Sequence, residues 1–361
     1  MGKDPMKLGG LFILIFTGVS FAFPQMVRSG YANCTTCHQS PTGGGILTPY
    51  GRNLSADLMS TWRAENEEQF LYGVPKLPEW LNLGGDIRAL QLYQNRASRE
   101  TAQFIFMQAD VEAAVSAGKT TADATVGVTN QGKPISRRHY VQIRPTDELS
   151  FRAGKFLPAA GINTENHSVA VKRGLGRDQG TETYNVEAAW IGQTLDLFVT
   201  GILGRIDNPD LGSEMGAALS SSLFLGDRHK IGASYVYLTR NVGTRNLAGP
   251  FFILGIGKKF FLLADTAFTW FTPKFGKTQA GFADTVRFDY EWVQGVHFYV
   301  SQEFVRNQFL DPASQMEAYG GGIQFFPRPH LEINAQYLRQ RYGGSSSTFA
   351  DFAYAMFHFY L

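Results

Sequence analysis

From residue 81 to the end of the chain, apolar and polar residues alternate along nearly every segment. Between positions 286 and 292, for example, Val, Phe, Tyr and Trp occupy every second position, with Arg, Asp and Glu between them. Segments 194–201, 230–240, 296–301 and 331–337 repeat the pattern. Because successive side chains of a strand point to opposite faces, these segments predict strands with one polar and one apolar face.

Strand length and aromatic placement indicate where these strands lie. The strands are about ten residues long, which matches a tilted strand that crosses a bilayer. Aromatic residues collect near the strand ends, as in the aromatic girdles of membrane barrels: Trp190, Phe260, Phe261, Trp270, Phe271, Trp292, Phe325 and Phe326. We count about sixteen strands, an even number typical of bacterial barrels. The predicted fold class is all-β, a transmembrane antiparallel β-barrel over residues 81–361; a soluble sandwich or stack of sheets is the alternative.

The last predicted strand, residues 349–361, ends the sequence and places Phe357, Phe359 and Leu361 on one face. This segment resembles the terminal signal of bacterial outer-membrane barrels, which usually closes on Phe or Trp rather than Leu. The resemblance implies an outer-membrane location with membrane lipid as a partner.

The first 22 residues predict a secretory signal peptide. Lys3 and Lys7 precede a mostly apolar run over residues 11–19, and small residues end the segment at Ser20 and Ala22. The apolar run is shorter than the roughly 20 residues that a membrane-spanning helix needs, and no stop-transfer pattern follows, which disfavours a membrane anchor. We expect export from a bacterial cytoplasm, with a mature chain that begins near Phe23.

Composition narrows the function classes. The chain has 361 residues and a formal net charge of +2, which gives no argument for a nucleic-acid partner. Its two cysteines lie in one short motif, so no disulfide framework is expected elsewhere.

Residues 23–80 predict a small N-terminal module with helices and loops. It holds the cysteine motif, a loop of Pro and Gly over residues 41–45, and a predicted helix that starts at Ser55 as N-cap and runs to Glu68. Pro75 and Pro78 then predict a linker to the barrel.

The motif Cys34-Thr35-Thr36-Cys37-His38 fits the C-x-x-C-H pattern of c-type haem attachment. Two thiols bind the haem covalently and the next histidine is the proximal ligand of the iron. A disulfide or redox pair is an alternative in an exported protein. A zinc site would need two further ligands nearby, and a thioredoxin-like site would need a βαβ unit. The sequence therefore predicts one covalent haem c per chain.

Residues 37–52 resemble the start of small exported c-type haem modules of proteobacteria. The resemblance implies that the glycine-rich loop packs over the haem edge and that Tyr50 and Arg52 bind a haem propionate. The sixth ligand stays open. Met59 is a tentative choice, beside Met26, a five-coordinate iron, or a barrel-wall residue such as His297.

The segment from Arg152 to Phe156, followed by Pro158, resembles a strand motif of phosphate-selective porins. The loop from Pro158 to Asn166 is expected either at the outer surface or folded into the lumen. Basic residues cluster nearby: Lys133, Arg137, Arg138, Arg144, Arg152, Lys155, Lys172, Arg173 and Arg177. Cations that face the lumen would attract anions, although large barrels have charged interiors in any case.

Two functions follow from these features. The first is electron transfer at the outer membrane; because one haem cannot bridge a hydrocarbon core of about 30 Å, a periplasmic or surface cytochrome must complete the path. The alternative is a porin for small solutes, anions among them, whose haem module plugs, gates or senses. An even strand number puts the module on the periplasmic side. No acid–base pair marks an enzyme.

Overall fold

The computed structural model describes residues 24–31, 33–96, 99–129, 131–164, 166, 169–207, 214–343 and 349–361. The predicted signal peptide, residues 1–22, lies outside the described residues.

Seventeen strand segments form one antiparallel sheet that closes into a barrel, because β1 pairs with both β2 and β17. β4 and β5 both pair with β3 and occupy one position, so sixteen strands surround the lumen. The predicted barrel of about sixteen strands is confirmed. The strands are β1 (Leu81–Arg96), β2 (Arg99–Ala117), β3 (Thr120–Val128), β4 (Pro134–Ile135), β5 (His139–Ile143), β6 (Leu149–Phe156), β7 (Thr183–Ile191), β8 (Leu195–Gly204), β9 (Met215–Leu225), β10 (His229–Arg240), β11 (Gly243–Ile256), β12 (Phe260–Pro273), β13 (Gln279–Val293), β14 (Val296–Arg306), β15 (Gln315–Arg328), β16 (Leu331–Tyr342) and β17 (Phe349–Tyr360).

The apolar face of the strands points outward, as the alternation predicts. On β14, Phe298 and Val300 are exposed, whereas His297 and Tyr299 beside them are buried in the lumen. Two aromatic residues assigned to the girdle face the other way. Phe261 and Phe326 are buried on the inner face. Adjacent residues of a strand point to opposite faces, and the preceding residues, Phe260 and Phe325, are exposed and half-exposed on the outer face.

The helical segments are short, and the predicted helix from Ser55 to Glu68 is wrong in its bounds: the chain is helical from Pro49 to Met59. Thr48 caps the actual helix, its Oγ1 accepting from the Gly51 amide at 3.0 Å, and proline fills the first helical position. One π-helical turn follows and ends at Met59. No described helix is long and apolar enough to cross a membrane. The segments are η1 (Pro24–Ser29), η2 (Cys34–Thr36), α1 (Pro49–Leu54), η3 (Ser55–Met59), η4 (Phe70–Gly73), α2 (Ala170–Arg173) and η6 (Pro312–Ser314).

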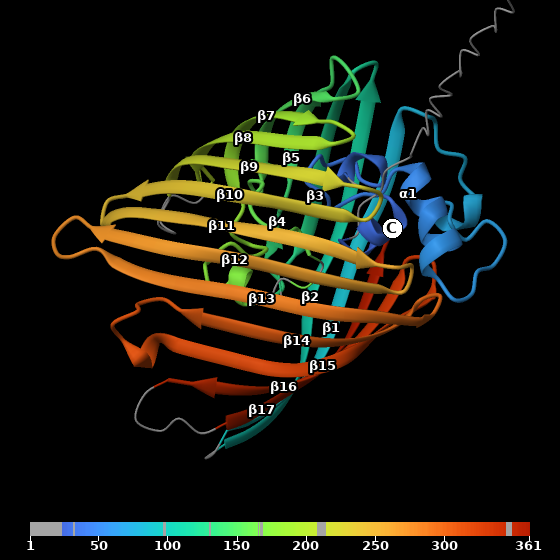
Figure 1. Ribbon diagram of the computed structural model, residues 1–361. Coiled ribbons are helices and arrows are strands. Elements are labelled where there is room, and N and C mark those ends of the chain that lie inside the picture. The colour runs from blue at the N-terminus through green and yellow to red at the C-terminus, as the bar shows by residue number, and fades with distance from the viewer. Residues whose placement is uncertain are drawn as a thin grey trace, which may run out of the picture.

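The N-terminal module sits at the end of the barrel where the C-terminus lies (Figure 1). Its residues bind the tight turns between strands at this end. Arg28 donates to Glu291 at 2.5 Å, and the Trp62 amide donates to the Pro327 carbonyl at 3.0 Å. Gln294 donates to the Ser60 carbonyl at 2.9 Å. The module is therefore docked across this mouth.

The loop between β6 and β7, residues 157–182, folds into the lumen rather than outward. Its segment around α2 buries Val169, Val171 and Leu175 in one apolar cluster. The inner wall completes this cluster with Ile202, Ala218, Val236, Leu238, Leu247, Ala267, Ala283 and Val305. Of the two expected positions of this loop, the structure has the one inside the barrel.

Candidate functional site

The C-x-x-C-H motif forms a single tight turn. The His38 and Cys37 amides both donate to the Cys34 carbonyl, at 2.9 and 3.2 Å. Asn33 Oδ1 accepts from the Thr35 and Thr36 hydroxyls and orders the start of the turn. Neither Cys34 nor Cys37 is in a disulfide. One turn of chain thus carries both thiols and the imidazole, as covalent haem attachment requires.

Helix α1 packs directly against this turn. The Thr48 amide donates to the Cys37 carbonyl at 2.8 Å, and the Thr48 hydroxyl donates to the Thr36 carbonyl at 2.7 Å. A Cβ at Gly51 would lie 2.4 Å from the Cys37 carbonyl oxygen. Position 51 therefore requires glycine for the helix to approach the motif this closely.

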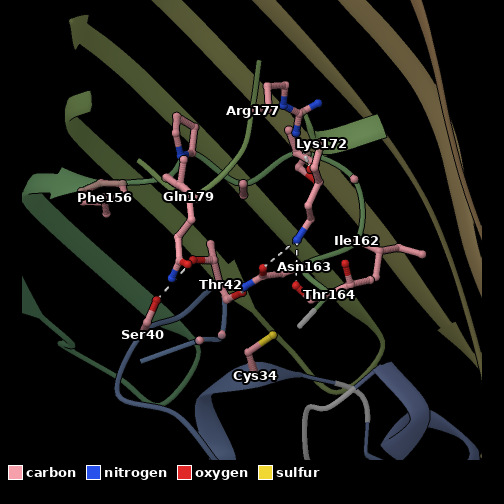
Figure 2. A pocket seen from close by; sticks show the side chains of 18 of the residues that line it. Cys34, Ser40, Thr42, Phe156, Ile162, Asn163, Thr164, Lys172, Arg177 and Gln179 are labelled. Carbon is pink, nitrogen blue, oxygen red and sulfur yellow. Dashed lines mark hydrogen bonds between the residues drawn. The ribbon is translucent and has the colours of Figure 1, made fainter. Parts of the chain in front are cut away.

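A cavity of about 320 Å³ lies between the module and the inserted loop (Figure 2). Cys34 and His38 line it from the module, and Asn163 and Lys172 line it from the inserted loop. Figure 2 shows the Cys34 sulfur turned toward this space. The volume falls within the roughly 300–1,000 Å³ typical of cofactor and ligand pockets.

Three consecutive glycines form the part of the module that enters the lumen. Gly43, Gly44 and Gly45 have φ of 78°, 73° and 68°, in the left-handed region that favours glycine. A Cβ at Gly43 would lie 3.3 Å from Cys34 Sγ, and one at Gly45 would lie 2.6 Å from the Arg138 guanidinium. The loop therefore runs close to both the thiol and the barrel wall.

Arg152 on β6 holds this loop against the wall. Its Nη1 donates to Ser40 Oγ at 3.1 Å and its Nη2 donates to Thr42 Oγ1 at 3.2 Å. Its Nε donates to Glu187 at 2.7 Å, and the guanidinium stacks 3.8 Å from the Phe156 ring centre. The wall thus presents an immobilised cation to the module, a role that neither the porin-like motif nor the basic cluster predicts for Arg152.

The inserted loop binds the same part of the module. Asn163 Nδ2 donates to the Thr42 carbonyl at 2.8 Å, and Lys172 Nζ donates to Asn163 Oδ1 and the Thr164 carbonyl (Figure 2). Arg177 donates to the Ala160 carbonyl. These bonds join the inserted loop and the module into one obstruction of the lumen.

Four of the nine basic residues of the predicted cluster are paired with carboxylates. The pairs and their N–O distances are Arg137–Asp110 at 2.8 Å, Arg138–Glu112 at 2.9 Å, Arg152–Glu187 at 2.7 Å and Lys155–Asp207 at 2.6 Å. The arrangement fits the charged interior of a large barrel better than a ring of free cations for anions.

Cys37 faces an apolar cluster beside the cavity. Met26, Leu47, Leu54 and Met59 pack with it from the module, and Phe326 and Tyr360 pack from the wall. Met59, the tentative sixth ligand, is thus close to the motif but does not line the cavity. Among the described residues, no group of three or more His, Cys, Asp or Glu is arranged to hold a metal ion.

The two residues expected at a propionate have other partners. Arg52 donates to Asn82 Oδ1 at 2.9 Å and to the Leu83 carbonyl, which ties α1 to β1. Burial lowers the pKa of Arg52 to about 10, so it stays charged at neutral pH. Tyr50 interacts with Tyr31, and burial followed by the charges of Tyr50 and Cys37 raises the Tyr31 pKa to about 12.

No protein-family model and no curated protein matches this chain. Solved structures do match. A loop L8 deletion mutant of OmpT, an outer membrane protein of Vibrio cholerae, superposes with a TM-score of 0.62 at 13% identity, covering 78% of this chain and 99% of that one. An anion-selective porin from Comamonas acidovorans superposes with a TM-score of 0.60 at 9% identity, over 78% of this chain and 99% of the porin. The outer membrane channel DcaP of Acinetobacter baumannii superposes with a TM-score of 0.56 at 11% identity, over 78% of this chain and 97% of the channel.

Identities this low establish a shared architecture only. The closed antiparallel sheet of sixteen strands is the common feature. The chain therefore has the fold of porin-like outer-membrane barrels.

Proposed function

We propose that this protein is an outer-membrane channel of the porin type whose lumen is closed near its periplasmic end by a haem-bearing N-terminal module. One observation carries the proposal: the loop over residues 40–45 enters the lumen and is bound there by Arg152 of the wall and Asn163 of the inserted loop. Passage of small solutes then depends on the position of this loop.

The residues of the motif fit a covalent haem c. Cys34 and His38 line a cavity of about 320 Å³, and Cys37 lies in the same turn beside an apolar cluster. The lack of a side chain at Gly43 leaves open the space next to Cys34. When bound, haem would supply an iron that changes oxidation state or takes up a small ligand. In this role Cys34 and Cys37 anchor the group and His38 is the proximal ligand.

The proposed orientation follows from the even number of strands. Both ends of the barrel segment meet at one mouth, since β1 and β17 pair from Asp86 and Tyr360 onward, and in bacterial barrels this end is periplasmic. Membrane lipid contacts the outer face. Because the wall cations are paired with carboxylates, the proposal includes no strong preference for anionic solutes.

Electron transfer at the outer membrane is the second candidate. It is favoured by the nearness of the motif to the exposed surface of the module: Tyr50, on the helix α1 that packs against the motif, is 43% exposed. A periplasmic cytochrome that docked at Tyr50 would come close to the haem edge. The hydrocarbon core of about 30 Å still requires a second redox partner beyond this haem.

Conductance in planar bilayers tests the proposed closure. We expect low conductance for the full, haem-loaded chain and a large increase when residues 24–80 are deleted. A full-chain variant, Ser40→Ala with Thr42→Val, guards against misfolding of the deletion. Equal conductance of all three proteins would refute the closure, and absence of covalent haem after export with a haem-attachment system would refute the haem assignment.

A further inference from the structure

Among the described histidines, only His38 and His358 line the cavity. His358 lies on β17 between Phe357 and Phe359, which both point outward to the lipid face. Alternation therefore turns His358 inward, where its side chain is 4% exposed. It is a titratable ring, aimed into the space next to the haem motif, that the proposed function does not yet use.

A buried carboxylate fixes the orientation of this ring. His358 Nδ1 lies 2.8 Å from Glu332 Oε2, and Glu332 is fully buried. Gln324 Nε2 donates to the other Glu332 oxygen at 2.7 Å, which holds the carboxylate in place. Histidines that ligate a metal usually bind a carboxylate or carbonyl through one nitrogen, which sets the tautomer and presents the other nitrogen to the metal.

The second nitrogen of the ring has no comparable bond. His358 Nε2 interacts with the Asp86 carboxylate, but across a longer distance than the bond at Nδ1. The Asp86 carboxylate lies 3.4 Å away, at the range of a weak ion pair, and Arg88 already binds both Asp86 oxygens at 3.0 Å. Asp86 and Arg88 also line the cavity. Nε2 is thus the nitrogen of this ring with the weaker protein partner, and a metal that displaced Asp86 would bind there.

A short series of contacts connects His358 to the motif. His38 forms a β-bridge with Leu47, and Leu47 packs with Tyr360 in the cluster around Cys37. The Tyr360 and His358 ring centres are 5.1 Å apart on the same inner face of β17. The wall at His358 therefore adjoins the segment that holds His38.

The other candidate ligands are placed less well. Met26 and Met59 are packed in the apolar cluster with Cys37 and do not line the cavity. His297, like His358, lies between two carboxylates, with Nδ1 2.8 Å from Asp289 and Nε2 3.6 Å from Glu291, but unlike His358 it does not line the cavity.

We propose that His358 would be the second protein ligand of the haem iron, in addition to His38, and that the barrel wall would thereby complete the site of the N-terminal module. The inference rests on the proposed covalent haem. Glu332 is a positioning residue that keeps Nε2 turned to the cavity. A six-coordinate iron bound by two imidazoles is low-spin and has no open position for a small ligand, which favours electron transfer over gas sensing.

The test is the spin state of the haem in full-length protein purified after export and haem attachment. We expect optical and paramagnetic resonance spectra of a low-spin, bis-imidazole iron in the wild type. His358→Ala should convert most of the haem to high-spin, and added imidazole should restore the low-spin spectrum. His358→Met, which keeps side-chain bulk, should give the charge-transfer band of a methionine–iron bond. Glu332→Gln should weaken the low-spin signal without abolishing it.

Matched controls separate the assignment of His358 as a ligand from the assignment of the covalent haem. His297→Ala removes another buried wall histidine and should leave the spectrum unchanged, as should Met59→Leu. A low-spin spectrum that persists in both His358 variants, or that is lost in Met59→Leu, would overturn the ligand while leaving the haem assignment intact. A wild type without haem would refute both. The heat-dependent gel mobility of the barrel reports whether each variant is folded.

Discussion

Removal of the two module hydroxyls that bind Arg152 should open the lumen. In Ser40→Ala with Thr42→Val, the buried pair of Arg152 and Glu187 stays intact, so the barrel wall keeps its own structure. A hydrogen bond to a charged group contributes about 1.5–3 kcal/mol. Because water can rehydrate the released groups, we take the lower end, about 3 kcal/mol for both bonds, which corresponds to a roughly 100-fold rise in the displaced population of the loop.

Single-channel recording in planar bilayers measures this population directly as the frequency and duration of open events. Ser60→Ala is the matched control, because the Ser60 hydroxyl donates only to the Ala56 carbonyl at 3.0 Å within the module. We expect the control to behave as wild type. The double variant must retain its haem and its folded gel mobility for this comparison. If its channel then opens only as often as the wild type, the hydrogen bonds from Arg152 to Ser40 and Thr42 do not hold the loop in the lumen.

Three further predictions concern the docking of the module. Arg52→Met loses the bonds to Asn82 and Leu83, and limited proteolysis should cleave the module faster while the barrel stays resistant. Gly51→Ala places a Cβ 2.4 Å from the Cys37 carbonyl and should lower the yield of covalent haem per protein, whereas Asn53→Ala on the exposed side of α1 should not. Burial opposes ionisation of Glu67, but the hydrogen bond and charge of Arg328 outweigh it and hold its pKa below the ordinary 4.5. The pair therefore stabilises docking above pH 4.5, and this stability is lost as pH falls through the lower, folded-state pKa; protease susceptibility of residues 60–80 should rise on acidification, and Glu67→Gln should remove that pH dependence.

The barrel could be predicted from the sequence because its signal is local. Each strand shows its two faces within about ten residues, and the outward position of Phe357 and Phe359 already implies that His358 points inward. The capped helix at Thr48 and Pro49 was also recognisable, since proline after an N-cap threonine is a known start signal. The prediction placed the helix later because Ser55 offered a second cap.

The contacts inside the lumen were not predictable in the same way. Arg152 and Ser40 are 112 positions apart, and nothing in either segment marks the other as its partner. The inward fold of the loop between β6 and β7 depends on the burial of Val169, Val171 and Leu175. These apolar residues in a loop are the feature of the sequence that indicates burial of the loop inside the barrel. Pairing of the wall cations likewise depends on strand register, which alternation alone does not specify.

The interface of the module has two parts with different physical character, and this limits how far the channel can open. Near the mouth, Met26, Leu54 and Met59 pack with wall residues in an apolar cluster, and exposure of that surface to water would be costly. At the tip, Ser40 and Thr42 make polar bonds that water can replace, on a loop whose glycines adapt to other conformations. Opening should therefore move the tip while the base stays docked. The double variant should consequently conduct less than the protein that lacks residues 24–80, and equal conductance would mean that the whole module leaves the barrel.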